Sequence, residues 1–159
     1  MSFFNTMNIS ATGLTAQRLR MDVIAENIAN VNTTRTADGG PYRRKTILFE
    51  EMRDNDPFSV VFSNLFGSGG TIPAPQGMGV RVTGIVEDDS PGLLVYDPTH
   101  PDAYPPGHEM EGYVRMPNVN IVEEMVNMIA ASRSYEANIT AIGMARTLTQ
   151  RTLEIGQGR

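Results

Sequence analysis

Two long stretches without proline, one at each end of the chain, constrain the fold most. All 10 prolines lie between Pro41 and Pro117, and most of the glycines lie in the same middle region. Because proline ends or kinks helices, residues 5–32 and 119–155 are predicted to be long helices, and the centre to consist of strands and loops. A helix of about 35 residues is roughly 50 Å long, which is more than one small domain can cover.

Apolar residues recur along both predicted helices at the spacing of a coiled coil. They return every seven residues in the first helix, and by mostly alternating steps of three and four in the last. Such stripes pack against other helices, so we expect the two ends to pair and to leave other apolar residues for neighbouring subunits. These are Val122, Val126 and Ile129 in the last helix, and Ile9, Leu19 and Val23 in the first. The predicted helix-seam and assembly residues are Met7, Leu14, Met21, Ile28, Ile121, Met125, Met128, Tyr135, Ile139, Ile142 and Leu153.

The middle region contains four short candidate strands. They cover residues 45–50, 58–62, 79–87 and 93–96, where β-branched and aromatic residues are frequent. The fold class predicted is α+β, with long N- and C-terminal helices that pair as a coiled coil and a small β-rich domain inserted between them. In domain terms, we expect residues 1–34 and 119–159 to form an inner coiled-coil layer, and residues 35–118 to form the β-rich middle domain.

Composition excludes several classes of function. The formal net charge of −5 gives no electrostatic reason to bind nucleic acid or an anionic membrane. The chain has no cysteine, so disulfides, zinc–thiolate sites and thiol nucleophiles are excluded. The first residues do not resemble a secretory signal, and no apolar stretch approaches the roughly 18 residues that a membrane span needs.

One group of residues consists of types that commonly bind metals, and we expect these residues to lie in a solvated loop. Its members have loose spacing in a proline-rich segment that offers no helix or strand to fix the donors. We find no nucleophile elbow, dinucleotide fingerprint or Walker loop, so we expect no enzyme, no metal site and no cofactor. The basic run at residues 43–45 is interpreted as a solvated strand start or a contact for an acidic partner. The cluster members are His100, Asp102, His108, Glu109 and Glu111.

The residues at the end of the first helix carry a resemblance to a known family. Residues 24–33, Ile-Ala-Glu-Asn-Ile-Ala-Asn-Val-Asn-Thr, resemble the N-terminal motif of the flagellar axial proteins, which form rods and hooks. Further stretches resemble rod proteins of that family, whereas the region 53–78 matches weakly and Gly143 departs from the usual pattern. The matching stretches are residues 41–45, 96–103, 112–120, 123–126 and 131–138.

The resemblance implies a non-catalytic subunit of the proximal rod of the bacterial flagellar basal body. Such a subunit transmits torque, is exported unfolded by the flagellar type III apparatus, and assembles in the periplasm. Its implied partners are other proximal-rod subunits, further copies of itself and a FliE-type adaptor. The motif residues Asn27, Asn30, Asn32 and Thr33 are expected to fix the turn out of the first helix.

Other interpretations of the same residues remain open at the level of sequence. The two helices also fit an antiparallel hairpin in a monomeric bundle. A monomeric or dimeric helical adaptor that binds another coiled coil is the main alternative function, and a metal-dependent enzyme using the histidine and carboxylate cluster is a further one. Mass measurement with and without rod partners distinguishes the adaptor, and stoichiometric metal in purified protein would favour the enzyme.

Overall fold

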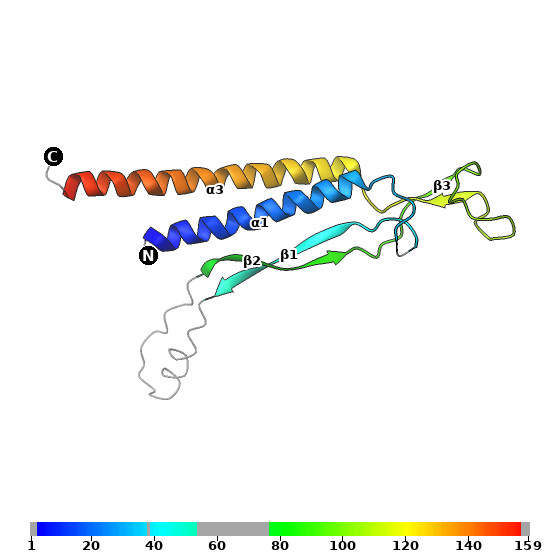
Figure 1. Ribbon diagram of the computed structural model, residues 1–159, viewed down its shortest axis with the longest axis horizontal. Coiled ribbons are helices and arrows are strands. Elements are labelled where there is room, and N and C mark those ends of the chain that lie inside the picture. Colours follow the sequence, from blue (N-terminus) through cyan, green and yellow to red (C-terminus); the bar gives the residue numbers. More distant parts are fainter. Residues whose placement is uncertain (1–2, 38, 54–76, 157–159) are drawn as a thin grey trace, which may run out of the picture. The chain divides into compact units, whose positions relative to one another are not determined.

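A helix lies at each end of the chain, and two small sheets lie between them in the sequence. The computed structural model describes residues 3–37, 39–53 and 77–156. Within these residues the strands form two two-stranded sheets, β1 with β2 and β3 with β4, so the predicted α+β class is confirmed. In chain order (Figure 1) the elements are α1 (Phe3–Ala29), β1 (Lys45–Arg53), β2 (Gly77–Glu87), β3 (Leu94–Tyr96), β4 (Tyr113–Arg115) and α3 (Ile121–Gly156).

The element boundaries follow the sequence prediction closely, with one omission. Both helices and the strands β1, β2 and β3 begin and end within a few residues of the predicted ranges. The strand β4 was not predicted, because three residues of Tyr-Val-Arg are too short to show an alternating pattern. The candidate strand at 58–62 lies outside the described residues.

The chain divides into two compact units, and each helix contributes a part to both. The first unit comprises Met1–Ala16, Phe49–Val82 and Tyr135–Arg159, and the second comprises Gln17–Leu48 and Thr83–Ser134. Each unit therefore contains a portion of α1, of α3 and of the β1–β2 pair. The division into terminal helices and an inserted middle domain stays a prediction.

In the first unit, α1 comes close both to α3 and to the start of β2. A Cβ atom added at Gly13 of α1 would lie 3.1 Å from the side-chain amide of Asn138 on α3, so the helices approach closely at a residue without a side chain. The Thr12 hydroxyl accepts a hydrogen bond from the Val80 amide at 3.2 Å. Gly79, at φ +123°, has no room for a Cβ atom because Thr12 Oγ1 would lie 2.2 Å away.

In the second unit, strands β3 and β4 form an antiparallel hairpin. Val95 pairs with Val114, and Tyr96 pairs with Tyr113. The two tyrosine rings meet edge to face, with 5.1 Å between centroids, an arrangement that is favourable for aromatic pairs. Val114 is buried, whereas Tyr96 and Tyr113 are exposed, so only one face of this hairpin contacts the rest of the unit.

The helix α3 begins at a side-chain cap. The Asn120 side-chain oxygen accepts a hydrogen bond from the Val122 amide at 3.1 Å, which satisfies one of the free N–H groups of the first turn. Glu123 and Glu124 lie in that turn, where the helix dipole favours negative charge. None of the described helices is both long enough and apolar enough to cross a bilayer.

Candidate assembly site

A buried polar cluster joins the end of α1 to the start of β1 and the start of α3 within the second unit. We call it the Asn27 cluster: Asn27, Tyr42, Arg44, Lys45 and Glu124. The Asn27 side chain is 1% exposed. Its amide nitrogen donates to the Lys45 carbonyl at 2.9 Å and to Glu124 Oε2 at 3.1 Å. Its oxygen accepts from the Lys45 amide and the Tyr42 hydroxyl, each at 2.9 Å. Asn27 therefore makes four hydrogen bonds, the full number its amide allows.

A buried ion pair forms the other half of the Asn27 cluster. Glu124 is 1% exposed, and its Oε1 accepts from Arg44 Nε at 2.8 Å and lies 2.7 Å from an Arg44 terminal nitrogen. Both guanidinium nitrogens contact the one oxygen Oε1, and such charge-assisted hydrogen bonds are stronger than neutral ones. Because both Glu124 oxygens are bonded, its charge is compensated. A buried ion pair with satisfied partners specifies one arrangement of the elements more than it adds stability.

Asn118 extends the same network to the end of β2. Its side-chain oxygen accepts from the Arg44 amide at 2.8 Å, and its nitrogen donates to the Asp88 carbonyl at 2.9 Å and the Ser90 hydroxyl at 3.1 Å. The Asp88 amide in turn donates to the Arg44 carbonyl at 2.8 Å. Residues 44, 88 and 118 are thus tied together just before α3 begins, which fixes the direction in which that helix leaves.

Electrostatics around the cluster are shaped by burial and by Glu26. Burial raises the pKa of the Tyr42 phenol above its ordinary value, and the Glu26 carboxylate adds to this shift. A hydrogen bond to Glu26, 2.5 Å from Lys45 Nζ, raises the pKa of the Lys45 ammonium. Tyr42 therefore stays a protonated donor to Asn27, and Lys45 stays charged, throughout the physiological pH range.

The four motif residues predicted to fix the turn out of α1 occupy different positions. Asn30 donates from its side chain to the Glu26 carbonyl at 2.9 Å, and the Thr33 hydroxyl donates to Asn30 Oδ1 at 3.1 Å. These two residues lie in the turn itself. Asn32 is exposed. Asn27 lies one turn earlier and bonds to β1 and α3 instead.

The predicted seam residues fall into two groups by exposure in the single chain. The half-buried group is Met7, Leu14, Met21, Ile28, Met128, Tyr135 and Ile142. The exposed group is Ile121, Met125, Ile139 and Leu153. The role of both groups in assembly stays a prediction.

The least exposed row of α3 follows a strict heptad made largely of small and polar residues. Its steps alternate between four and three without a gap, as in a coiled coil. Ala131 and Ala145 are buried, so α3 can come close to its neighbour along this row. The row is Glu124, Met128, Ala131, Tyr135, Asn138, Ile142, Ala145 and Thr149.

Large apolar side chains lie outside that row and face solvent. In the first turns of α3, within the second unit, the spacing i, i+1, i+4, i+5 and i+8 places five of them on one side of the helix. Val122 is 66% exposed and Val126 is 62% exposed. We call this surface the α3 apolar face: Ile121, Val122, Met125, Val126 and Ile129. The part of α3 in the first unit also exposes Met144, Leu148, Leu153 and Ile155.

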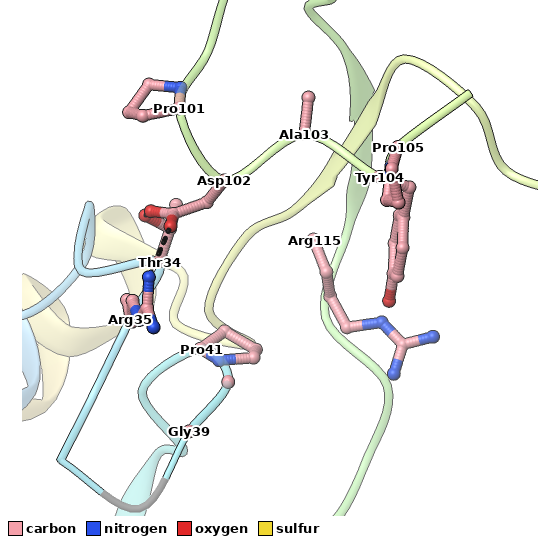
Figure 2. Close-up of a pocket in the computed structure, with 11 residues that line it drawn as sticks. Thr34, Arg35, Gly39, Pro41, Pro101, Asp102, Ala103, Tyr104, Pro105 and Arg115 are labelled. Atoms are coloured by element: carbon pink, nitrogen blue, oxygen red, sulfur yellow. Dashed lines mark hydrogen bonds and ion pairs between the residues drawn. The ribbon is translucent and has the colours of Figure 1, made fainter. Parts of the chain in front are cut away.

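The histidine and carboxylate cluster does not converge on a metal position. Among the described residues, no three histidine, aspartate or glutamate side chains are grouped to hold an ion. His100 Nδ1 accepts from the Asp102 amide at 3.1 Å, and His108 Nδ1 accepts from the Met110 amide at 3.3 Å. Asp102 accepts from the Thr34 hydroxyl at 2.7 Å (Figure 2). These side chains stabilise the loop between β3 and β4.

Sequence reasoning did not find the Asn27 cluster, although its parts carried signals. Arg44 was assigned to a basic run open to solvent or to an acidic partner; the structure corrects this, because its guanidinium pairs with Glu124 of the same chain. Glu124 was included only as part of the matching stretch 123–126. The two residues are 80 positions apart, so no local pattern could pair them.

Comparison with known proteins places these features in families of flagellar proteins. The family "Flagella basal body rod protein" matches residues 7–35, which cover most of α1 and its turn. The family "Flagellar basal body rod FlgEFG protein C-terminal" matches residues 110–155, which cover β4 and α3. Both ends of the Asn27–Glu124 contact lie inside these matched segments.

Full-length relatives carry the same description. The flagellar basal-body rod protein FlgC of Borreliella burgdorferi is 50% identical over 158 residues, covering 99% of this chain and 100% of the relative. FlgC of Bacillus subtilis is 44% identical over 161 residues, with 99% and 100% covered. FlgC of Aquifex aeolicus is 37% identical over 155 residues, with 97% of each chain covered.

Proposed function

The chain belongs to the FlgC family of flagellar basal-body rod proteins, and on that premise we propose how it builds the rod. As a member of this family it is a structural subunit of the bacterial flagellar rod. We propose that α1 and α3 form an inner coiled-coil layer by packing against α1 and α3 of neighbouring subunits. The β strands then brace the outside of that layer, and the assembled subunits transmit torque as part of the proximal rod.

The observation that carries this proposal is the α3 apolar face. Burying a whole Val, Ile or Met side chain contributes about 1.5–3 kcal/mol, and roughly half or more of each of these five side chains is still exposed. Covering the face therefore contributes on the order of 1 kcal/mol per residue. A contiguous apolar surface of this kind marks a protein interface, and a neighbouring rod helix is the occupant that membership of the family supports.

The Asn27 cluster supports the mechanical part of the proposal. Torque acts on the junction between the end of α1 and the start of α3. Directional hydrogen bonds hold this junction, whereas side-chain packing alone would let the elements slide past each other. Asn27 and Glu124 meet across that junction, and Arg44, the residue before β1, binds Glu124. A fully bonded polar cluster rigidifies such a junction because any shift leaves buried groups unpaired.

The partners and route of this chain are part of the same proposal. Its neighbours are other proximal-rod proteins, further copies of itself and a FliE-type adaptor, and it reaches the periplasm unfolded through the flagellar type III export apparatus. Its role is non-catalytic. The histidines and carboxylates of residues 100–111 support this, because their hydrogen bonds serve the loop they belong to.

The substitution Val126→Glu tests the proposal, with Val126→Ile as the matched control. Because Val126 is 62% exposed, a glutamate there is hydrated in the isolated chain, and the unfolding midpoint is expected to stay close to that of the native protein. In the rod the same carboxylate is buried without a partner, which costs several kcal/mol. Motility and recovery of the chain in purified basal bodies are expected to be lost with glutamate and kept with isoleucine.

Charged substitutions at Leu14 and Ile139 extend the test to the predicted seam. Wild-type rod assembly with charge at both positions would reject these residues as assembly contacts. A stable monomer or dimer that binds no rod protein, together with normal motility of Val126→Glu, would favour the helical adaptor instead.

A further inference from the structure

A pocket in the second unit, which the role proposed above does not use, contains a positive charge without a partner. Loop residues 34, 35, 39–41 and 101–105, together with Arg115 at the end of β4, line a cavity of about 420 Å³. This volume lies in the range of about 300–1,000 Å³ that is typical of binding sites. Figure 2 shows Asp102 directed toward Thr34 on one side, and Arg115 beside Tyr104 on the other.

Arg115 is the residue that makes this cavity a candidate site. Its Nε atom is buried and has no hydrogen-bond acceptor among the described residues. A buried donor without an acceptor is unfavourable, and a guanidinium is best matched by a carboxylate that accepts two of its N–H groups. Asp102 does not serve, because its oxygens face the Thr34 hydroxyl at 2.7 Å and Arg35 at 3.9 Å.

The remaining lining suits a side chain inserted from a loop. Pro41, Pro101, Ala103 and Pro105 contribute apolar surface to the lining of the cavity. With Arg35 and Arg115 against Asp102, the lining carries one excess positive charge. The pocket is therefore complementary to a single carboxylate presented by a short apolar segment.

The chain itself carries a carboxylate of that description. Glu109 lies in the loop between β3 and β4, is exposed, and makes no hydrogen bond or ion pair with any described residue. Its neighbour Glu111 accepts from the Gly107 amide at 3.1 Å, which holds the loop and leaves Glu109 at its surface. Met110 follows it in the sequence, and the ring of His108 before it stacks on Tyr104 with 4.6 Å between centroids. Within one chain Glu109 and Arg115 do not pair.

We propose that Glu109 of one copy of this chain binds Arg115 in the pocket of the next copy. The loop between β3 and β4 supplies residues 101–105 of the pocket lining as well as Glu109. Because Glu109 of one copy would bind a different residue, Arg115, of the next copy, the contact is head-to-tail, the type that builds rings or helical assemblies. This inference rests on the proposed function, because it needs several copies side by side in the rod. It assigns the loop between β3 and β4 a role in lateral contact between copies.

The composition of the chain allows a direct test in purified basal bodies. Lys45 is its single lysine, so the substitution Arg115→Lys introduces one new side-chain amine where a carbodiimide can join it to a touching carboxylate. Lysine keeps the charge and most of the stem of arginine, so the variant is expected to fold. Lys45 and Glu26, in contact in every copy, provide an internal positive control for the coupling chemistry.

The expected product is a covalent dimer in which residue 115 is joined to Glu109. The dimer should disappear in Arg115→Lys with Glu109→Gln and persist in Arg115→Lys with Glu111→Gln. The proposal would be overturned by a link from residue 115 to Asp102 of its own chain or to another protein. It would also be overturned if residue 115 formed no link while the Lys45–Glu26 link formed. Absence of the chain from basal bodies would contradict the proposed function, which is a separate result.

Discussion

The substitution Asn27→Asp tests the Asn27 cluster without changing its volume. It replaces an amide nitrogen that donates two hydrogen bonds with an oxygen that donates none. The Lys45 carbonyl and Glu124 Oε2 both lose their donor, and the new carboxylate faces the carboxylate of Glu124 at about the present separation of 3.1 Å. The bonds from the Tyr42 hydroxyl and the Lys45 amide remain, now to a charged acceptor.

The expected cost follows from these contacts. Loss of the bond to a neutral carbonyl costs about 1 kcal/mol, and loss of the bond to the charged Glu124 costs about 1.5–3 kcal/mol. Two like charges 3 Å apart repel by roughly 5 kcal/mol at an effective dielectric constant of 20. Most of that repulsion is offset by rotation of the side chains, by the positive charge of Arg44 and by the stronger hydrogen bonds from Tyr42 and Lys45. We expect a net loss of about 3–5 kcal/mol in the free energy of unfolding at pH 7.

The loss should depend on pH in a defined direction. Burial and Glu124 raise the pKa of the introduced carboxyl group above its unfolded value of about 3.9. Between these two pKa values the folded variant binds more protons than the unfolded one, so its stability falls as pH rises. The difference from the native protein is therefore smallest near pH 4 and grows toward pH 7, because the protonated group can donate to Glu124 again.

Urea denaturation followed by circular dichroism measures this, with Asn30→Asp as the control. The Asn30 side chain donates one bond, to the Glu26 carbonyl at 2.9 Å at an exposed site, and accepts one from the Thr33 hydroxyl, which an aspartate can still accept. The same chemical change there should therefore cost about 1 kcal/mol or less. If Asn27→Asp destabilises no more than Asn30→Asp at pH 7, the cluster does not hold α1 and α3 together as argued.

Three further predictions concern backbone strain and titration. Gly79→Ala is expected to lower the free energy of unfolding by about 1–3 kcal/mol, because φ is +123° and the new Cβ atom would meet a hydroxyl of α1 at 2.2 Å. Gly84 has open space around it, so Gly84→Ala should be neutral in the same denaturation assay. Burial raises the pKa of Tyr42, so absorbance titration should show one phenol ionising later than the others, and Tyr42→Phe should remove that phase. Hydrogen bonds from Thr99 lower the pKa of Asp97. The stability that this carboxylate contributes is therefore present above about pH 3.9 and is lost as the pH falls through the pKa of the folded state. Amide chemical shifts of the loop would report this change.

Local patterns were sufficient for the helices and most of the strands. The absence of proline and the heptad spacing predicted α1 and α3 because both signals act over consecutive residues. The same reasoning favoured large apolar side chains for the contact row of α3, and Met128, Tyr135 and Ile142 do lie in the least exposed row. That row also contains Ala131, Ala145 and the charged Glu124, because small side chains and a compensated carboxylate allow a close approach that hydrophobicity does not reveal.

The Asn27 cluster lay beyond sequence reasoning for a physical reason. Its contacts join residues 15 to 97 positions apart, and a buried carboxylate is unfavourable unless a specific partner neutralises it. Nothing in the neighbourhood of Glu124 identifies Arg44 as that partner. In the folded chain Glu124 and Arg44 lie together. The polar character that suggested solvent exposure in the sequence then indicates that the junction between α1 and α3 is held in one arrangement.

The central claim is that rod assembly covers the α3 apolar face, and thiol labelling at Val126 measures this directly. The chain has no cysteine, so Val126→Cys provides a single reactive group, to be labelled with a maleimide in the isolated chain, in intact basal bodies and in the same basal bodies after denaturation. The account predicts rapid labelling of the isolated and denatured samples and strong protection in intact basal bodies. Equal labelling of the intact basal bodies and the isolated chain would contradict it.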